Sequence, residues 1–112
     1  MYEVTETEVA ILGYAGPGAP AYPRFPRTDG LTAAAVATGQ AVVADDVTAD
    51  PRYLTAFGST RSEMIVPVVG ADGATALGTI DVESDRVAAF GDDERELVER
   101  VAVASLPLYA RY

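Results

Sequence analysis

Alternation of hydrophobic and polar positions is clearest in the middle of the chain, where it predicts two paired strands. Residues 64–69 are apolar, and residues 76–84 place polar side chains between apolar ones, as in strands whose successive side chains point to opposite faces of a sheet. Asp72-Gly73 lies between these stretches and is typical of a hairpin turn. Shorter strands are predicted at 1–5, 8–14 and 40–46.

Helical periodicity predicts two helices, one short and one long. The first, at 31–38, is rich in alanine and ends at Gly39, a residue that readily adopts the left-handed conformation of a helix end. The second starts near Asp93 and Glu96, which we expect to form a capping box, and ends before Pro107. Its apolar face is predicted to comprise Leu97, Val98, Val101, Ala102 and Ser105.

Proline and glycine residues interrupt the pattern at 16–27, which we expect to be an extended loop or a sheet edge. A second loop follows residue 46 and leaves room for one short helix before Gly58. This order of elements is that of an α+β protein, an antiparallel sheet with flanking helices. A chain of 112 residues fits a single domain, which we take to be 1–112.

The charge balance is strongly acidic, which excludes some partners. The 8 basic residues are all arginine, and the 17 acidic residues give a net charge of −9. Binding to nucleic acid or to an anionic membrane surface is not expected, because both interactions need a basic patch. No apolar run approaches the roughly 18 residues of a membrane span, so we expect a soluble, cytoplasmic protein.

The chain contains no cysteine and no histidine. Their absence excludes a disulfide, a thiolate nucleophile, a zinc–thiolate site, an imidazole base and haem ligation by histidine. The acidic residues also lack the spacing of an EF-hand loop. We therefore expect no catalytic residue, no metal site and no cofactor, and we interpret the chain as not an enzyme.

Three acidic residues interrupt the two central strands: Glu63 begins the first, and Asp81 and Glu83 lie within the second. Asp81 and Glu83 share one face of the sheet, because alternate residues of a strand do so. In an antiparallel pair, the residue numbers of any two facing residues add to the same sum. Glu63 joins Asp81 and Glu83 on their face only if that sum is even. A connection of odd length gives that register and a two-residue turn does not, so we expect the odd connection.

In that register the three carboxylates line one acidic pocket on the sheet. Ionised carboxylates accept hydrogen bonds, so the pocket suits a ligand with ammonium, guanidinium or hydroxyl groups. Tyr53 is a candidate aromatic lid for this pocket. A structural interpretation stays open beside this one, in which Glu63 pairs with Arg61 or Arg52, Asp81 binds a loop amide, and Tyr53 belongs to a packed turn.

Four motifs of the chain, in this order, resemble those of GAF domains: DGLTAAAVATG, VVADDVTADPRY, RSEMIVPV and ALGTIDVES. The resemblance covers roughly residues 8 to 104 and implies the GAF fold. GAF domains usually begin with a long helix ahead of the first strand, and that helix is missing or truncated here. The uncovered face implies self-association, as a homodimer or with a partner chain through the C-terminal helix.

Within the family, the strands that carry Glu63, Asp81 and Glu83 are most similar to those of free methionine-(R)-sulfoxide reductases. The resemblance implies that these acids hold an amino-acid-like ligand. The reductases perform their chemistry with cysteines, and the matching positions in this chain are near Thr32 and Ala56. Sulfoxide reduction by a thiol of this chain is therefore excluded.

We interpret the chain as a non-catalytic sensory or regulatory GAF domain that binds a small polar molecule in the acidic pocket. A structural dimerisation module without a ligand is the alternative, favoured if the acids pair with arginine and the cavity is filled. An enzyme with a carboxylate base is a third interpretation, because Asp81 beside Glu83 would raise the pKa of one carboxyl group.

Overall fold

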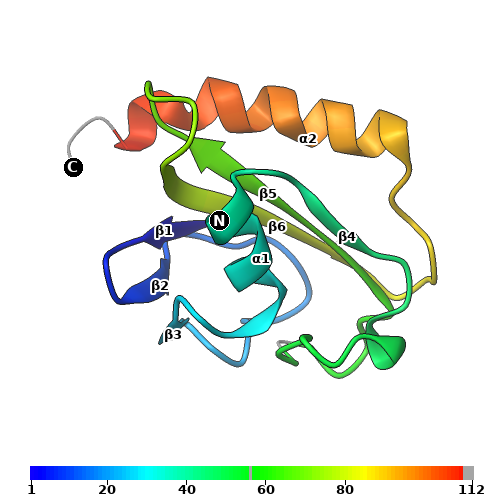
Figure 1. Ribbon diagram of the computed structural model, residues 1–112. Coiled ribbons are helices and arrows are strands. Elements are labelled where there is room, and N and C mark those ends of the chain that lie inside the picture. Colours follow the sequence, from blue (N-terminus) through cyan, green and yellow to red (C-terminus); the bar gives the residue numbers. More distant parts are fainter. Residues whose placement is uncertain (56, 110–112) are drawn as a thin grey trace.

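The computed structural model describes residues 1–55 and 57–109 as one antiparallel sheet with helices on its two faces (Figure 1). The strand order across the sheet is β3-β2-β1-β6-β5-β4. The predicted α+β fold is confirmed. The elements are β1 (Tyr2–Val4), β2 (Glu8–Ile11), β3 (Arg24–Pro26), α1 (Gly30–Thr38), β4 (Val42–Ala44), the 3-10 turn η1 (Val47–Ala49), β5 (Ser62–Val69), β6 (Ala76–Ser84), α2 (Asp92–Ser105) and the 3-10 turn η2 (Leu106–Tyr109).

Alternate residues of β5 build two separate cores, one on each face of the sheet. Met64, Val66 and Val68 pack under α2 and η2. Ile65 points the other way and packs with residues of α1, β4 and η1. Full burial of each such side chain contributes about 1.5 to 3 kcal/mol, so hydrophobic contact holds both helices to the sheet. Figure 1 shows α1 and α2 on its opposite faces.

The register of β5 against β6 is the even one that was expected, with Glu63 facing Glu83 and Ile65 facing Asp81. The connection differs from the expectation. Val69 faces Ala76 whereas Val68 faces Gly78, so a bulge interrupts the ladder next to the turn. The bulge, rather than a connection of odd length, therefore places the three acids on one face.

The helix ends follow the sequence signals only in part. Gly39 adopts the left-handed conformation with φ 67° and ends α1, as predicted. The capping box predicted from Asp93 and Glu96 is wrong, because the helix begins earlier than that pattern implied. Glu94 instead accepts a hydrogen bond from the backbone N–H of Gly91 at 2.9 Å, and the acidic first turn complements the helix dipole.

The face that α2 turns to the sheet is narrower than predicted. Ala102 and Ser105 are buried and Val98 packs against the core. The inclusion of Leu97 and Val101 in this face is wrong, because their side chains are 52% and 47% exposed. Each residue turns the helix by about 100°, so these two lie beside the stripe that meets the sheet.

The proline-rich segment provides a sheet edge, and the loop after β4 contains one short 3-10 turn, as expected. β3 pairs only with β2 and so occupies one edge of the sheet, where prolines are tolerated. Neither helix of the described residues is long and apolar enough to cross a membrane.

Candidate functional site

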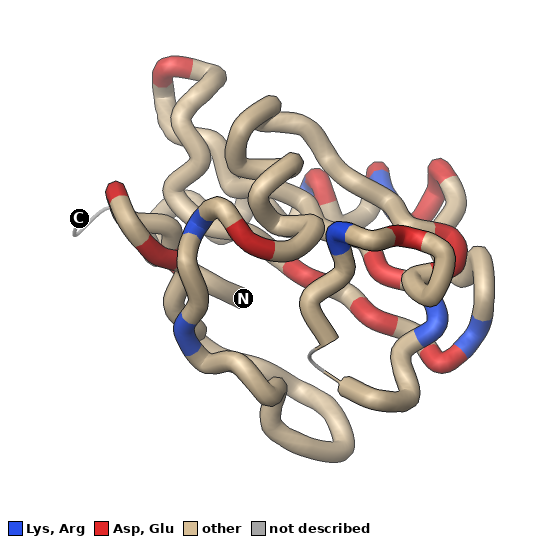
Figure 2. The backbone as a smooth tube through the Cα atoms, turned by 60° about the horizontal axis from the view of Figure 1, so that its bottom comes forward, with Lys and Arg blue, Asp and Glu red and all other residues tan. Residues whose placement is uncertain are grey.

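The carboxyl groups of Glu63, Asp81 and Glu83, called the acidic site below, lie on the sheet face that carries α1. Glu63 and Glu83 are directly opposed in the β5–β6 ladder. Asp81 lies two residues before Glu83, so the two side chains share a face. Figure 2 marks the acidic positions along the backbone in red.

Two adjoining cavities reach the acidic site. The inner cavity measures about 30 Å³ and adjoins all three acids. The outer cavity measures about 430 Å³ and shares Tyr2, Asp81 and Glu83 with the inner one. Its other walls come from the 14–20 loop, the 57–60 loop and the end of β6. The acidic site therefore forms the floor of a cavity with room for a small molecule.

Two of the three acids have hydrogen-bond partners and the third has none. The Tyr53 hydroxyl donates to Glu83 Oε1 at 3.0 Å, and the Thr79 hydroxyl donates to Asp81 Oδ1 at 2.6 Å. Glu63 is only 7% exposed, and its carboxyl group makes no hydrogen bond within the described residues. A buried carboxyl group without a partner is costly, and such groups in a cavity are candidates for ligand binding.

Arginine does not neutralise the acidic site in the part of the chain that the structure describes. Arg52 binds Asp50 instead, with Nη2 and Oδ2 separated by 2.8 Å. No ion pair joins Arg61 to Glu63 among residues 1–55 and 57–109. The interpretation that pairs Glu63 with arginine thus has no support in these contacts.

Burial and mutual repulsion raise the pKa values of the acidic site. The pKa of Glu63 is raised to about 9, first by burial and then by the charges of Glu83 and Asp81. Burial raises the pKa of Asp81 to about 6, although the Thr79 hydroxyl opposes the shift. Without a ligand, Glu63 is therefore protonated at neutral pH and can donate a hydrogen bond.

Tyr53 lies beside the acidic site in a role that differs from a lid. Its ring packs against the core under α1, and its hydroxyl holds Glu83. Burial raises its pKa to about 12. Its own turn is tightly bonded, because Asp50 accepts from the Arg52 backbone N–H at 2.9 Å. Tyr53 borders neither cavity of the acidic site, so in this arrangement it positions a carboxylate.

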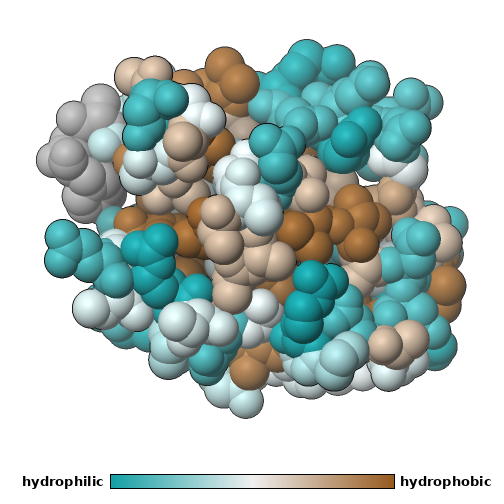
Figure 3. All heavy atoms as spheres, in the orientation of Figure 1, coloured by the Kyte–Doolittle hydropathy of each residue, from teal (hydrophilic) through white to brown (hydrophobic). Residues whose placement is uncertain are grey.

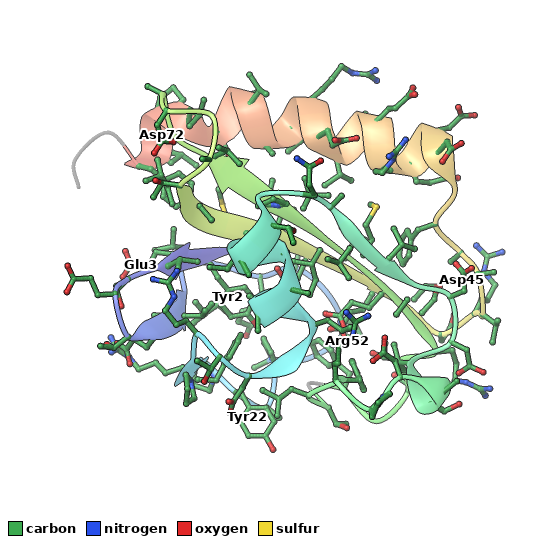
Figure 4. All side chains as sticks on the ribbon, viewed as in Figure 1. Tyr2, Glu3, Tyr22, Asp45, Arg52 and Asp72 are labelled. Carbon is green, nitrogen blue, oxygen red and sulfur yellow. The ribbon has the colours of Figure 1, made fainter. Side chains whose placement is uncertain are left out.

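The structure adds residues that the sequence did not single out. Tyr2 borders both cavities and packs edge-to-face on Phe25, with ring centroids 5.6 Å apart. Figure 4 shows Tyr2 inside the molecule near α1. Thr32, which matches a cysteine position of the reductases, borders the inner cavity together with Asp81. The second matching position, Ala56, lies outside the described residues.

Comparisons with known proteins agree with the resemblance to GAF domains. The GAF domain family model matches residues 3–104. A free methionine-R-sulfoxide reductase of Saccharomyces cerevisiae is 32% identical over 73 residues, which is 65% of this chain and 40% of the relative. The chain thus spans less than half of that protein.

Solved structures agree with this comparison. The type II free methionine-R-sulfoxide reductase from Thermoplasma acidophilum has a TM-score of 0.90 and 29% identity, covering 99% of this chain and 77% of that one. The free methionine-R-sulfoxide reductase from Neisseria meningitidis was solved in complex with its substrate. It has a TM-score of 0.79 and 30% identity, and the match covers 90% of this chain and 59% of that one.

The prediction that the chain is not an enzyme is wrong in the light of these relatives, which are enzymes. It rested on the lack of cysteine and histidine, which excludes only chemistry performed by those side chains within this chain. The match over residues 3–104 covers nearly the whole chain and all elements of the sheet from β2 onward. The chain belongs to the GAF domain family.

Proposed function

We propose that this domain binds a small amino-acid-like molecule through Glu63, Asp81 and Glu83. The observation that carries the proposal is Glu63, a carboxyl group 7% exposed, without a hydrogen-bond partner in the described residues and beside the inner cavity. A ligand with an ammonium group would supply the missing partner, and its positive charge would favour the ionised form of Glu63. Charge-assisted hydrogen bonds of this kind are about twice as strong as neutral ones.

The sizes of the two cavities favour a ligand whose ammonium group enters the inner cavity while the rest stays in the outer one. The inner cavity of about 30 Å³ has room for a group about the size of a water molecule, such as an ammonium. The outer cavity of about 430 Å³ accommodates the remainder of the ligand. Thr79 and Tyr53 hold Asp81 and Glu83 in place for this contact.

Methionine sulfoxide is the first compound to test, because relatives at 29 to 32% identity are free methionine-R-sulfoxide reductases. Reduction of a sulfoxide takes two electrons, which two thiols supply as they form a disulfide, and the oxygen leaves as water. The 112 residues contain no cysteine. Dithiothreitol is therefore added to the activity assay, and turnover above the uncatalysed rate would extend the proposal from binding to catalysis.

Isothermal titration calorimetry with free methionine sulfoxide tests the proposal. We expect saturable binding to the wild type and at least tenfold weaker binding to Glu63→Gln, because the loss of a charged hydrogen bond costs about 1.5 to 3 kcal/mol. Glu96→Gln, on the exposed face of α2, removes the same charge and should bind like the wild type. Equal affinities of the wild type and Glu63→Gln would contradict the proposal.

We propose a second role, self-association through α2, on a separate observation. Leu97, Val101 and Leu108 are 52%, 47% and 57% exposed. Leu97 and Val101 form an apolar stripe on one side of α2 because they are four residues apart, and Leu108 lies beyond the helix in η2. Figure 3 shows hydrophobic surface in brown near the C-terminal end of α2. A second copy of the chain would bury this stripe. A sensory or regulatory output and a cytoplasmic location stay predictions.

Sedimentation velocity tests the association. We expect a dimer for the wild type and a monomer for Val101→Arg, because a buried unpaired charge opposes the contact. Glu99→Arg, which lies on the same helix but off the apolar stripe, is the matched control and should remain dimeric. A monomeric wild type at 100 µM would rule out this association.

A further inference from the structure

The charges around both cavities have one sign. Four acidic residues border them, namely Glu63, Asp81, Glu83 and Asp85, and no arginine does among the described residues. The one positive group present is the α-amino group of Met1, which donates to the Gly13 carbonyl at 2.9 Å and whose pKa is lowered by burial. Even with Glu63 protonated, the single α-ammonium of an amino acid faces three other carboxyl groups, and its own α-carboxylate adds to the excess of negative charge.

Asp85 is placed differently from the acidic site. It lies two residues beyond Glu83, borders the outer cavity alone and is exposed, with no ion pair in the part of the chain that the structure describes. A ligand whose ammonium group reaches Glu63 therefore extends past Glu83 toward Asp85. The outer cavity is also lined by Tyr2, Tyr14 and Phe57, and the faces of aromatic rings attract cations.

We propose that the site selects amino acids or amines that carry two positive charges, the first bound by Glu63, Asp81 and Glu83 and the second by Asp85. This inference rests on the proposed function and narrows its ligand to the dicationic class. The unpartnered carboxyl group of Glu63 marks the place of the first cation. Asp85 and the aromatic wall of the outer cavity mark the place of the second.

Lysine and norleucine make the direct test, because they differ in the charged terminal amine. We expect calorimetry in low salt to give at least tenfold tighter binding of lysine than of norleucine. In Asp85→Asn, lysine should bind about threefold more weakly and norleucine as before, since an exposed pair contributes about 0.2 to 1 kcal/mol. Asp45→Asn, an acidic residue outside both cavities, should leave both affinities unchanged.

The outcomes separate this inference from the proposed function. Norleucine or methionine sulfoxide binding as tightly as lysine would overturn the dicationic preference while the amino-acid site stands. Lysine binding that ignores Asp85→Asn would overturn the placement of the second cation. If lysine, norleucine and methionine sulfoxide all fail to bind, both the inference and the proposed function are wrong.

Discussion

Glu63→Gln is expected to raise the free energy of unfolding of the ligand-free domain by about 5 kcal/mol at pH 8. The pKa of Glu63 is about 9 in the fold and 4.5 as its ordinary value. At pH 8 the unfolded chain therefore carries an ionised Glu63, whereas folding has to protonate it. Glutamine has nearly the same shape and removes that cost. Urea unfolding of both proteins at pH 8 and at pH 5 measures the difference.

The pH dependence has a definite sign. Between pH 4.5 and 9 the folded state binds more protons at Glu63 than the unfolded state, so the stability of the wild type falls as pH rises. The pKa of Asp81 is raised to about 6, so Asp81 adds to this loss of stability in the lower part of the pH range. Glu63→Gln should flatten this slope. Glu96→Gln, which is exposed, should retain it, and a wild type that is equally stable at pH 5 and pH 8 would contradict the assignment.

This combination of effects distinguishes a binding site from a structural cluster. A carboxyl group that stabilises a fold through a salt bridge weakens the protein when it is replaced. Glu63 has no such partner in the described residues, so its replacement should strengthen the protein and weaken ligand binding together. Opposite changes in stability and function are typical of residues retained for binding.

The acidic site could be predicted from the sequence because local rules determine it. Alternation in 76–84 places Asp81 and Glu83 on one face, and the apolar positions of β5 favour the register that adds Glu63. The bulge beside Val69 was not predicted, since the two-to-one pairing that a bulge needs leaves no local signal here. A correct register was thus obtained with an incorrect account of the turn.

Residues that reach the site from distant segments could not be found in this way. Tyr2 borders the cavities because β1 pairs with β6, with Tyr2 facing Thr79, and this neighbour relation depends on the order of the whole sheet. The exposed side of α2 was missed for a related reason. Apolar periodicity shows that Leu97 and Val98 are near one face, but only packing against the sheet decides which of them is buried.

Gly78→Ala is expected to lower the free energy of unfolding by about 3 kcal/mol, at the upper end of the cost of overpacking. A Cβ atom at this position would lie 2.3 Å from the Tyr2 backbone oxygen and 2.2 Å from the Tyr109 hydroxyl. That hydroxyl donates to the same Tyr2 oxygen at 2.8 Å and ties η2 to β1. The methyl group would therefore part β1 from β6, and thermal unfolding should show a melting temperature lower by about 15 °C.

Two comparisons separate this clash from a general intolerance of alanine. Gly70→Ala places its Cβ 3.5 Å from the Leu77 side chain, an ordinary contact, and should melt near the wild type. Tyr109→Ala combined with Gly78→Ala should recover only part of the loss, because the clash with the Tyr2 backbone oxygen remains. Tyr2 also borders both cavities, so Gly78→Ala should weaken ligand binding as well. If Gly78→Ala has the same melting temperature as the wild type, the close approach of β1, β6 and η2 at this glycine is wrong.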